Sequence, residues 1–557
     1  MVQTEKEYSM DNKNLKQNPN TADMIMYSGK IITVDRDFSI AQAVAIKGNT
    51  ILAVGKDQEM DTFKGTQTKM VNLQGKTVIP GLIDSHIHGS MCAQEINNFK
   101  LNKARSINDL LQAIEQCISK TQQGQLVVSS SAWHESQLSE ERLPTRWELD
   151  QVSPNHPVIL PRGGHVVVVN SKALELVAFT KDTPNPEHGL IVKDPDTNEP
   201  TGVLMENAAT IVKDLVPRLT REQLKQGVID FMKEMNAYGI TGMIDPWTTD
   251  SEISVYSELS EQDKMTVRTQ ALYAVVSLQE TLDAVSKYKP RQGNDYFCVS
   301  GIKTLADGGV EGAWMKQPHQ IVAGEQPNPE YRGVQIYAGA AREKEFVDIL
   351  KVVAENGFQM QVHAAGDAAN EFVVNSYEEV NNIIQIQDLR WVVMHVMYPT
   401  KASLNKIKEL GILTTVQDHP YLLGRNMKRY WGEQRTNSAI PLRTLLGKGI
   451  IMGGGTDAPV VPWNPFISIA WMVTRRIVNG EVQGVDESIS REAALYLWTK
   501  GSAYVQGNEN KLGSIEPGKL ADLVVLSEDL LTIPAEKIES IEAVTTIVGG
   551  KIVYQAK

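Results

Sequence analysis

The segment Val78–His88 reads VIPGLIDSHIH and closes an apolar run with two histidines. Residues i and i+2 of a β-strand point to the same face, so we expect the side chains of His86 and His88 to enter the same volume. Two neutral imidazoles that converge in this way can bind one metal cation. They can also be two polar residues that happen to end a strand, so the rest of the chain has to separate the two interpretations.

Seven more short apolar runs follow, and helical patterns such as those of residues 221–239 and 340–357 alternate with them. The runs occupy residues 240–247, 265–275, 298–309, 358–367, 389–398, 412–420 and 450–459. Alternation of helices with buried strands indicates parallel pairing, and eight strands favour closure into a barrel. The sequence therefore predicts an α/β fold based on a (β/α)8 TIM-like barrel, with an open, doubly wound sheet as the alternative.

The two ends of the chain have a different pattern from the middle. Residues 23–75 and 506–557 contain short strands broken by turns, and neither block is long enough to form a good sandwich alone. We therefore predict a small β-sandwich built from both termini, with the barrel of residues 76–505 between its halves. Residues of about 90–220 are predicted to form an inserted α/β subdomain after the first barrel strand, and the polar residues 1–22 a disordered tail.

Polar side chains interrupt the apolar runs at their carboxyl-terminal ends. These residues are His86, His88, Lys303, Asp307, His363, His395, Gln417, His419 and Asp457. In a closed parallel barrel these strand ends share one face, where active sites are built. Any one histidine could be a hydrogen-bonded structural residue, and Asp457 could cap a helix. Their joint occurrence favours a metal centre, because four histidines and an aspartate offer the ligands that Zn²⁺ prefers.

Lys303 is the unusual member of this set, because it lies within the apolar run VSGIKTLADGG. Burial disfavours a charged ammonium group. A neutral lysine amine can react with CO₂ to give a carbamate, whose two oxygens can bridge two metal ions. The alternative is a salt bridge from Lys303 to Asp307 or Asp457.

With these residues in place, the chain resembles the amidohydrolase superfamily of metal-dependent hydrolases, and within it the YtcJ-like branch that includes N-substituted formamide deformylases. The resemblance covers nearly everything after the tail, and its motifs occur in the family's order. They are VIPGLIDSHIH, LPTRWELDQVSPNHPVILPRGGHVVVVNSKAL, TGVLMENAA, IKTLADGG, QVHAAGDAAN, GGTDAPVVPWNPF and KLGSIEPGKLADLVVL. The resemblance implies a β/α barrel with a β-sandwich from both chain ends, which matches the layout predicted above.

The resemblance also implies a role for each candidate residue. His86 and His88 would bind the more buried metal, and His363 and His395 would bind a second one. Lys303 matches the position of a carboxylated lysine that bridges the two ions, so the expected content is one Zn²⁺ per chain, or two if Lys303 is carboxylated. Asp457 would be both a ligand of the first metal and the catalytic acid/base.

Two positions depart from the family pattern. The sixth motif reads VVMHVMY, where relatives often have a glutamate before the histidine, and Gly309 stands where a serine is common. Both differences lie near the predicted site, so the substrate of a relative cannot be transferred directly.

The predicted function is hydrolysis of the C–N amide bond of a small molecule, such as an N-substituted formamide, by a metal-bound hydroxide. Alternatives are a cyclic amidase or a deaminase of the same superfamily, or a catalytically inactive protein that binds a small molecule. A deaminase is disfavoured because HAAGDAAN offers Asp367 but no nearby glutamate after His363. Candidates for substrate binding come from the insertion and are Trp133, His134, Arg162 and His165.

The composition of the chain limits the kinds of partner and the cellular compartment that we expect. The formal net charge is −12 and no block of lysine and arginine occurs, which argues against a nucleic-acid or anionic-membrane surface. Three widely spaced cysteines indicate a reducing compartment. No apolar stretch approaches the roughly 20 residues of a membrane span. We expect a soluble, cytoplasmic enzyme, and the resemblance implies a homodimer.

Overall fold

The computed structural model describes residues 21–164, 166–187, 189–321 and 329–557. Residues 1–20, the greater part of the predicted tail, lie outside the described residues. No helix in the described part of the chain is both long and apolar enough to cross a membrane.

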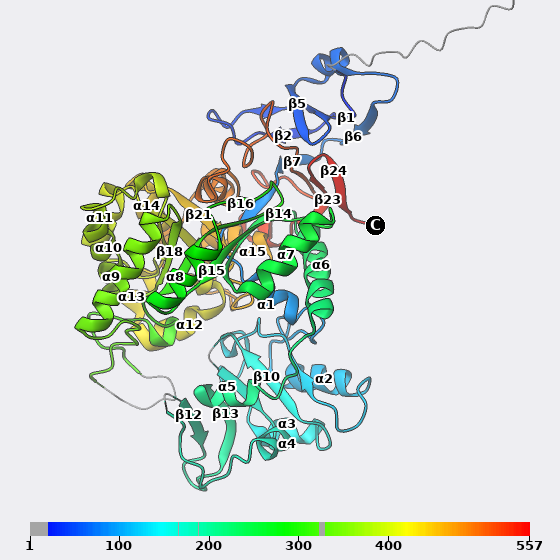
Figure 1. The fold of residues 1–557 in the computed structure, drawn as a ribbon. Coiled ribbons are helices and arrows are strands. Elements are labelled where there is room, and N and C mark those ends of the chain that lie inside the picture. The colour runs from blue at the N-terminus through cyan, green and yellow to red at the C-terminus, as the bar shows by residue number, and fades with distance from the viewer. Residues whose placement is uncertain (1–20, 165, 188, 322–328) are drawn as a thin grey trace, which may run out of the picture.

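A sheet of eight parallel strands forms the centre of the molecule (Figure 1). The strands are β8 (Leu82–Asp84), β14 (Ile240–Thr248), β15 (Arg268–Ala274), β17 (Phe297–Leu305), β18 (Gln359–Ala364), β19 (Val392–His395), β20 (Leu413–Gln417) and β21 (Met452–Gly455). They lie side by side in chain order, and the short β16 (Gln292–Gly293) pairs with β17 outside this path. All eight predicted apolar runs therefore contribute a strand to the barrel.

The barrel closes between its first and last strands. The backbone N–H of Ser85 donates to the carbonyl of Gly454 at 2.9 Å, and that of Asp457 donates to the carbonyl of His86 at 2.7 Å. Glycines make this close approach possible. A Cβ atom on Gly455 would lie 2.6 Å from an Asp84 carboxylate oxygen and 2.8 Å from the backbone nitrogen of His86.

Helices surround the barrel and occupy the connections between its strands. They are α1 (Gly89–Gln94), α6 (Arg221–Ala237), α7 (Asp250–Glu261), α8 (Leu278–Lys287), α9 (Ala340–Glu355), α10 (Asp367–Asn381), α11 (Lys401–Glu409), α12 (His419–Trp431), α13 (Glu433–Asn437), α14 (Leu442–Gly447), α15 (Pro465–Thr474), α16 (Arg491–Tyr496) and α17 (Ser502–Val505). Their starts follow local sequence rules: Thr220 with Gln223 and Thr249 with Glu252 form capping boxes at α6 and α7. The largest apolar core packs these helices on the strands.

The first apolar run divides between two sheets. Its first half forms β7 (Thr77–Pro80), which pairs with β2 (Lys30–Ile32) and β22 (Leu523–Leu526), and only Gly81 separates it from β8 of the barrel. A side chain at residue 81 would collide with Thr241, since a Cβ atom there would lie 2.1 Å from its hydroxyl oxygen. His86 and His88 consequently follow β8 instead of lying within it, in contrast to the strand geometry expected for them.

Strands from both ends of the chain form two further sheets. One has the order β5-β4-β1-β6 and the other the order β24-β23-β22-β7-β2-β3. The remaining strands are β1 (Met24–Tyr27), β3 (Ile40–Ala41), β4 (Ala43–Lys47), β5 (Thr50–Gly55), β6 (Lys69–Asn72), β23 (Ala543–Val548) and β24 (Lys551–Gln555). One apolar cluster joins Met26 and Val44 to Leu523 and Ile547, so the two sheets share a core.

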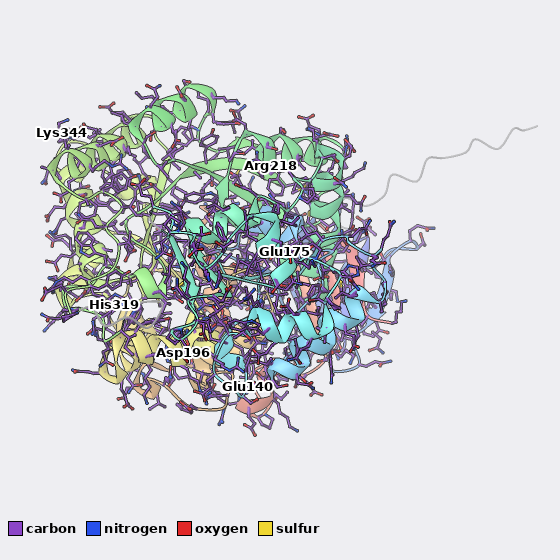
Figure 2. All side chains as sticks on the ribbon, turned by 90° about the horizontal axis from the view of Figure 1, so that it is seen from below. Glu140, Glu175, Asp196, Arg218, His319 and Lys344 are labelled. Atoms are coloured by element: carbon purple, nitrogen blue, oxygen red, sulfur yellow. The ribbon has the colours of Figure 1, made fainter. Side chains whose placement is uncertain are left out.

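The insertion has its own sheet, in the order β12-β13-β11-β10-β9. Its elements are α2 (Ile107–Ile118), β9 (Val127–Val128), α3 (Arg146–Val152), β10 (Val158–Arg162), β11 (Val166–Val169), α4 (Ser171–Leu176), β12 (Gly189–Lys193), β13 (Pro200–Glu206) and α5 (Asn207–Lys213). It lies at the end of the molecule opposite the two sheets formed by both ends of the chain, which we call the two-terminus sheets (Figure 1). Viewed from below, its residues Glu175 and Asp196 lie in front of the barrel, whereas Lys344 of α9 lies at the periphery (Figure 2).

Candidate metal centre

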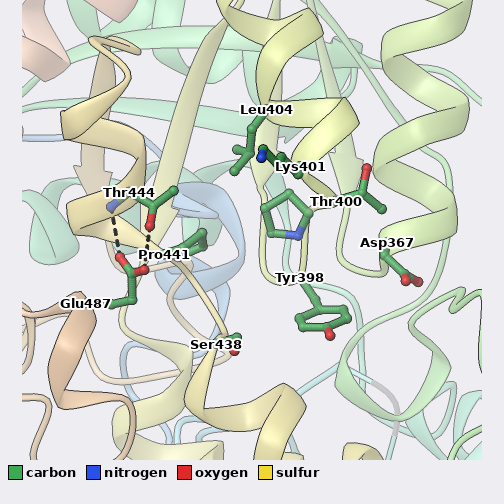
Figure 3. Close-up of a pocket in the computed structure, with 10 residues that line it drawn as sticks. Asp367, Tyr398, Thr400, Lys401, Leu404, Ser438, Pro441, Thr444 and Glu487 are labelled. Carbon is green, nitrogen blue, oxygen red and sulfur yellow. Dashed lines mark hydrogen bonds between the residues drawn. The ribbon is translucent and has the colours of Figure 1, made fainter.

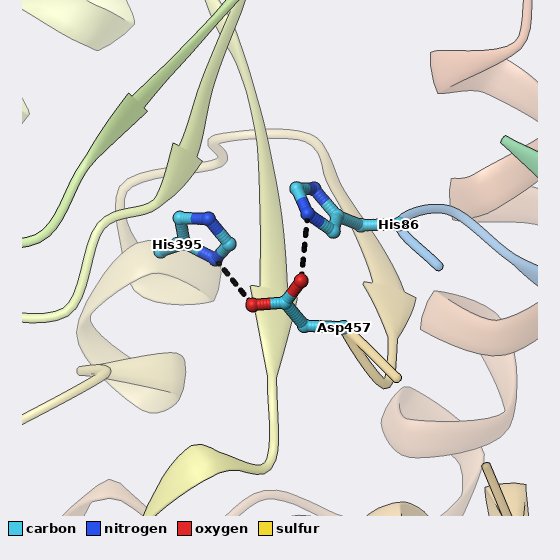
Figure 4. Close-up of side chains that lie close together, drawn as sticks. All are labelled: His86, His395 and Asp457. Atoms are coloured by element: carbon cyan, nitrogen blue, oxygen red, sulfur yellow. Dashed lines mark ion pairs between the residues drawn. The ribbon is translucent and has the colours of Figure 1, made fainter. Parts of the chain in front are cut away.

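The structure brings together the imidazoles and the carboxylate that the sequence placed at separate strand ends. One carboxylate oxygen of Asp457, Oδ1, lies 3.0 Å from Nε2 of His86 and 3.1 Å from Nε2 of His88. The other, Oδ2, lies 4.0 Å from Nδ1 of His395 (Figure 4). The ring centroids of His363 and His395 are 4.5 Å apart.

His86 and His88 are held by the turn that follows β8. The carboxylate of Asp84 accepts hydrogen bonds from the backbone N–H of His86 and from the hydroxyl of Thr456, at 3.0 and 2.7 Å. His88 precedes α1 directly. The backbone N–H of Ser90, in the first turn of α1, donates to Asp245 at 2.8 Å. The turn is therefore fixed to the last barrel strand on one side and to β14 on the other.

The rings of His363 and His395 are oriented by neighbouring acceptors. Nε2 of His363 lies 3.0 Å from the carbonyl of Gly308 and 3.3 Å from a carboxylate oxygen of Asp307. Nδ1 of His395 lies 2.7 Å from the amide oxygen of Gln417. In each ring these contacts engage one nitrogen, which leaves the other free to bind a metal, as is usual for metal-ligating histidines.

The donor atoms fit a divalent cation. Among the described residues, His86, His395 and Asp457 form a group whose ligand atoms all lie within 4.8 Å of one another. Both ring nitrogens of His86, Nδ1 of His88 and Oδ1 of Asp457 are buried and have no hydrogen-bond partner in the described part of the chain. Unsatisfied buried polar atoms are costly, and a bound cation would satisfy those that face it.

The charge states also suit metal binding. Burial lowers the pKa of His86 to about 3 and that of His395 well below its usual value, so both imidazoles are neutral at pH 7, the form that binds metals. Burial alone would raise the pKa of Asp457, but His86, His419 and His88 hold it well below the usual range. The carboxylate is therefore ionised.

Lys303 is buried in the barrel with its amine beside Met394. Nζ lies 2.7 Å from the sulfur of Met394, and among the described residues it has no carboxylate within ion-pair distance. The salt bridge to Asp307 or Asp457 that the sequence left open is thus absent. Burial lowers the pKa of the Lys303 amine to about 7, so a large fraction is neutral at neutral pH. That is the form that reacts with CO₂.

His419 ends an apolar run in the sequence, but it is not among the predicted site residues. Nε2 of His419 lies 2.8 Å from Oδ2 of Asp457, closer than any of the four predicted histidine ligands comes to that carboxylate. Its location after an apolar run, like that of His363 and His395, is the signal that could have identified it.

The candidates in the insertion have different environments. Trp133 is fully buried in the core of the insertion, and its indole N–H donates to the carbonyl of Pro161 at 2.6 Å. His134 is also buried, and its Nε2 has no hydrogen-bond partner among the residues that the structure describes. His165 lies outside the described residues.

Arg162, a predicted substrate-binding residue, is paired with two carboxylates. Its guanidinium donates to both carboxylate oxygens of Glu135, at 2.8 and 2.7 Å, and to Glu311 of the barrel at 3.0 Å. Sequence analysis missed these partners because Glu135 lies in a turn and Glu311 lies far along the chain. The ion pairs join the insertion to the loop after β17, so Arg162 contributes to the attachment of the insertion.

A separate cavity of about 360 Å³ opens near the carboxyl ends of β18 and β19 (Figure 3). Asp367, Tyr398, Lys401 and Glu487 are among its lining residues. None of the predicted metal ligands lines it, so the cavity is distinct from the metal centre.

A model of the amidohydrolase family matches residues 69–554. The chain belongs to the amidohydrolase family. This amidohydrolase is 27% identical over 548 residues to protein LONG AFTER FAR-RED 3 of Arabidopsis thaliana, covering 96% of this chain and 92% of that protein. It is 26% identical to the protein YtcJ of Bacillus subtilis, covering 95% and 99%. It is also 26% identical to the N-substituted formamide deformylase of Arthrobacter pascens, covering 96% and 98%. These relatives confirm the resemblance drawn from the motifs.

Solved structures share the fold of this amidohydrolase. A metal-dependent hydrolase from Pyrococcus horikoshii superposes with a TM-score of 0.71 at 21% identity, covering 92% of this chain and 99% of that one. A metal-dependent hydrolase from Pyrococcus furiosus gives 0.68 at 23% identity, covering 91% and 100%. The predicted fold class, a (β/α)8 barrel with additional domains, is confirmed.

Proposed function

We propose that this amidohydrolase cleaves the C–N bond of a small linear amide, with N-substituted formamides as the first candidates. The observation that carries the proposal is the group of His86, His395 and Asp457, whose buried donor atoms converge and include atoms without hydrogen-bond partners. Nearly full-length similarity to an N-substituted formamide deformylase supports the choice of substrate class.

His86, His88 and Asp457 would hold one Zn²⁺, and His363 and His395 a second one if Lys303 is carboxylated between them. A divalent cation held there supplies a Lewis acid that lowers the pKa of water and polarises a carbonyl oxygen. The histidines fix the ligand geometry, and Gln417 and Gly308 orient the rings of His395 and His363.

Asp457 would act as the acid/base. Its ionised carboxylate takes a proton from the attacking water and returns it to the leaving nitrogen when the C–N bond breaks. Oδ2 already accepts one hydrogen bond from His419 and keeps a second lone pair for that proton.

The shape of the site favours a small substrate. The side chains of His86 and His395 are 1% exposed, whereas those of His88 and His363 are 15% and 12% exposed. Substrate therefore approaches past His88 and His363. Burial lowers the pKa of His134 to about 4, so its ring is neutral. Nδ1 accepts from the N–H of Ser136, so Nε2 carries the proton and could donate to a substrate oxygen. Trp133 and Arg162 would contribute indirectly, by packing and by holding Glu135 and Glu311 in place.

The test is a screen of purified protein, with metal content measured on the same samples. N-formyl amines, N-acyl amines, cyclic amides and aminopurines separate the linear amidase from a cyclic amidase and a deaminase. We expect turnover of N-formyl amines that is lost on chelation and restored by Zn²⁺. Full activity in metal-free protein would contradict the proposal, and metal binding without turnover of any class would favour an inactive binding protein.

A further inference from the structure

Among the histidines that the structure describes, His419 makes the closest contact to the carboxylate of Asp457. It is the first residue of α12 and follows β20 by two residues, at the carboxyl end of the barrel. Its side chain is 2% exposed, and Nε2 lies 2.8 Å from Oδ2 of Asp457. Nδ1 is buried and has no hydrogen-bond partner among the described residues. Within that part of the chain, the hydrogen bond of the His419 ring is the one to Asp457.

The two oxygens of Asp457 face different neighbours. Oδ1 lies between Nε2 of His86 and Nε2 of His88, where it makes no hydrogen bond. Oδ2 is the oxygen that His419 contacts. An N–H donated to Oδ2 fixes the plane of the carboxylate, and with that plane fixed Oδ1 remains directed at the two histidines.

The backbone and the side chain of Asp457 are held by different contacts. Its φ angle is +65°, in the left-handed region that residues other than glycine rarely adopt. Such conformations persist only where the surroundings hold them in place. The N–H of Asp457 bonds to the carbonyl of His86, which fixes the backbone but leaves the side-chain torsions free. Contact with His419 supplies the missing restraint on the side chain.

The geometry points to His419 as a positioning residue, which donates Nε2–H to Oδ2 of Asp457 and so would present Oδ1 to a bound metal and Oδ2 to the reacting proton. The catalytic part of this inference rests on the proposed function, whereas the orientation of Asp457 and the affinity for Zn²⁺ do not depend on any substrate. Nε2 of His419 is engaged with Asp457 in this arrangement, so that nitrogen is not available as a metal ligand.

Two amide variants of His419 separate positioning from packing. In His419→Gln the amide nitrogen occupies nearly the place of Nε2 and can still reach Oδ2 of Asp457. In His419→Asn the amide nitrogen occupies the place of Nδ1, which has no partner, and the contact is lost. Both variants keep a polar, uncharged side chain at the start of α12, so thermal midpoints should be similar and act as the folding control.

The measurements are the Zn²⁺ dissociation constant by chelator competition and the side-chain conformation of Asp457 in crystals of each metal-free protein. We expect His419→Asn to weaken Zn²⁺ binding about tenfold or more and to release the Asp457 side chain, and His419→Gln to restore most of the lost affinity. On a formamide substrate, His419→Asn should lower kcat more than it changes KM.

Equal Zn²⁺ affinity and an unchanged Asp457 conformation in both variants would overturn the positioning role. The same holds if Gln and Asn are equally impaired. If no amide is turned over by the unmodified enzyme, the proposed function fails, but the affinities and the crystal conformations still decide whether His419 orients Asp457.

Discussion

Strained backbone marks the residues of the metal centre. His395 and Asp457 have φ angles of +69° and +65°, and Val396 follows with +45°. Each non-glycine residue in this region costs of order 1–3 kcal/mol, which the surrounding contacts have to offset. Two of the three residues in the converging metal group are therefore held in place by the fold at some cost in stability, as is typical of functional sites.

Asp457→Asn tests the acid/base role. The amide keeps the size of the side chain and one oxygen, but it cannot take up a proton at neutral pH. At saturating Zn²⁺ we expect the bound metal to stay within about threefold of the unmodified content, because the histidine ligands remain, while the Zn²⁺ dissociation constant rises and kcat falls by about 10²–10⁴. Metal content and turnover of an N-formyl amine are measured on the same preparation. Near-normal turnover would remove Asp457 from this role.

Lys303→Ala tests the bridging carbamate. Without the amine no carbamate forms, so we expect the second Zn²⁺ and most of the activity to be lost. Short carboxylic acids, such as acetate or propionate, should restore both in part, because a carboxylate supplies the same pair of oxygens. Intact mass of the unmodified protein, with and without bicarbonate, gives an independent measure. Activity that is insensitive to Lys303→Ala would favour a single-metal enzyme.

The residues of the site differ in how far the sequence could predict them. His86, His363, His395 and Asp457 were accessible because each ends an apolar run, and strand ends converge in a closed barrel. The partners of Arg162 were not accessible, since Glu135 and Glu311 meet it only through tertiary packing. The role of His419 was missed because its strand-end position, taken alone, does not distinguish a ligand from a residue that contacts one.

Glycines of β21 determine how closely the ends of the barrel approach. Cβ atoms at Gly453 and Gly454 would lie 2.7 Å from the Ser85 hydroxyl oxygen and 2.9 Å from the Trp498 ring. At Gly455 the obstacle includes backbone atoms of His86, which cannot rotate away. Gly453 and Gly455 thus allow β21 to approach β8 closely enough to place Asp457 beside His86, whereas Gly454 makes room for Trp498.

Gly455→Ala should therefore displace His86. We expect Zn²⁺ affinity to fall about tenfold or more and the thermal midpoint to decrease, because the new methyl group has no room between β21 and the turn after β8. Gly447→Ala is the matched control, because its Cβ would meet no atom within 4 Å. That control should bind Zn²⁺ normally. Unchanged metal affinity in Gly455→Ala would show that β21 can move away from β8 without displacing the metal ligands.

The strands, like the site residues, differ in whether the local sequence or a tertiary contact determines them. All eight barrel strands follow from apolar runs and helix alternation. The division of the first run between β7 and β8 does not, because it depends on Thr241 lying against Gly81 across the sheet. The boundaries of the predicted domains and the homodimer stay predictions.

Ion pairs attach the insertion to the barrel across the molecule. Glu135 accepts both Arg162 and the amide of Asn426 in α12, and Arg162 also reaches Glu311. The Glu135 carboxyl is 9% exposed. Burial opposes ionisation, but Arg162 and His134 lower the pKa of Glu135 to about 2, from an ordinary value of 4.5. This attachment is therefore sensitive to acid.

Glu135→Gln tests that sensitivity. A depressed carboxyl pKa stabilises the fold above the unfolded value of about 4.5 and loses its effect as the pH falls towards about 2. We expect the variant to have a lower thermal midpoint than the unmodified protein at pH 7 and the gap to narrow at pH 3. Glu148→Gln removes a partly exposed ion pair with Arg142. The difference in thermal midpoint between this variant and the unmodified protein should be smaller. A gap that does not change with pH would contradict the assignment.

The barrel and the two-terminus sheets share a second buried ion pair, between Arg268 at the start of β15 and Asp522 before β22. The guanidinium donates to the two Asp522 oxygens at 2.7 and 3.0 Å, and the side chains are 5% and 4% exposed. Oδ1 of Asp522 also accepts the N–H of Gly549 at 2.8 Å. Because β7 continues into β8 through Gly81 alone, the strands of the two units are coupled covalently as well.

Asp522→Asn should consequently destabilise the whole molecule rather than the carboxyl-terminal segment alone. Breaking a buried pair leaves Arg268 uncompensated, at a cost of about 3–5 kcal/mol. We expect one cooperative unfolding transition in the unmodified protein, followed by fluorescence and far-ultraviolet circular dichroism, and a single transition at lower temperature in the variant. Lys511→Met removes the exposed pair with Asp295 and should shift the midpoint little. A variant that unfolds in two separated steps would show that the barrel keeps its stability without this contact, and that the two units fold independently.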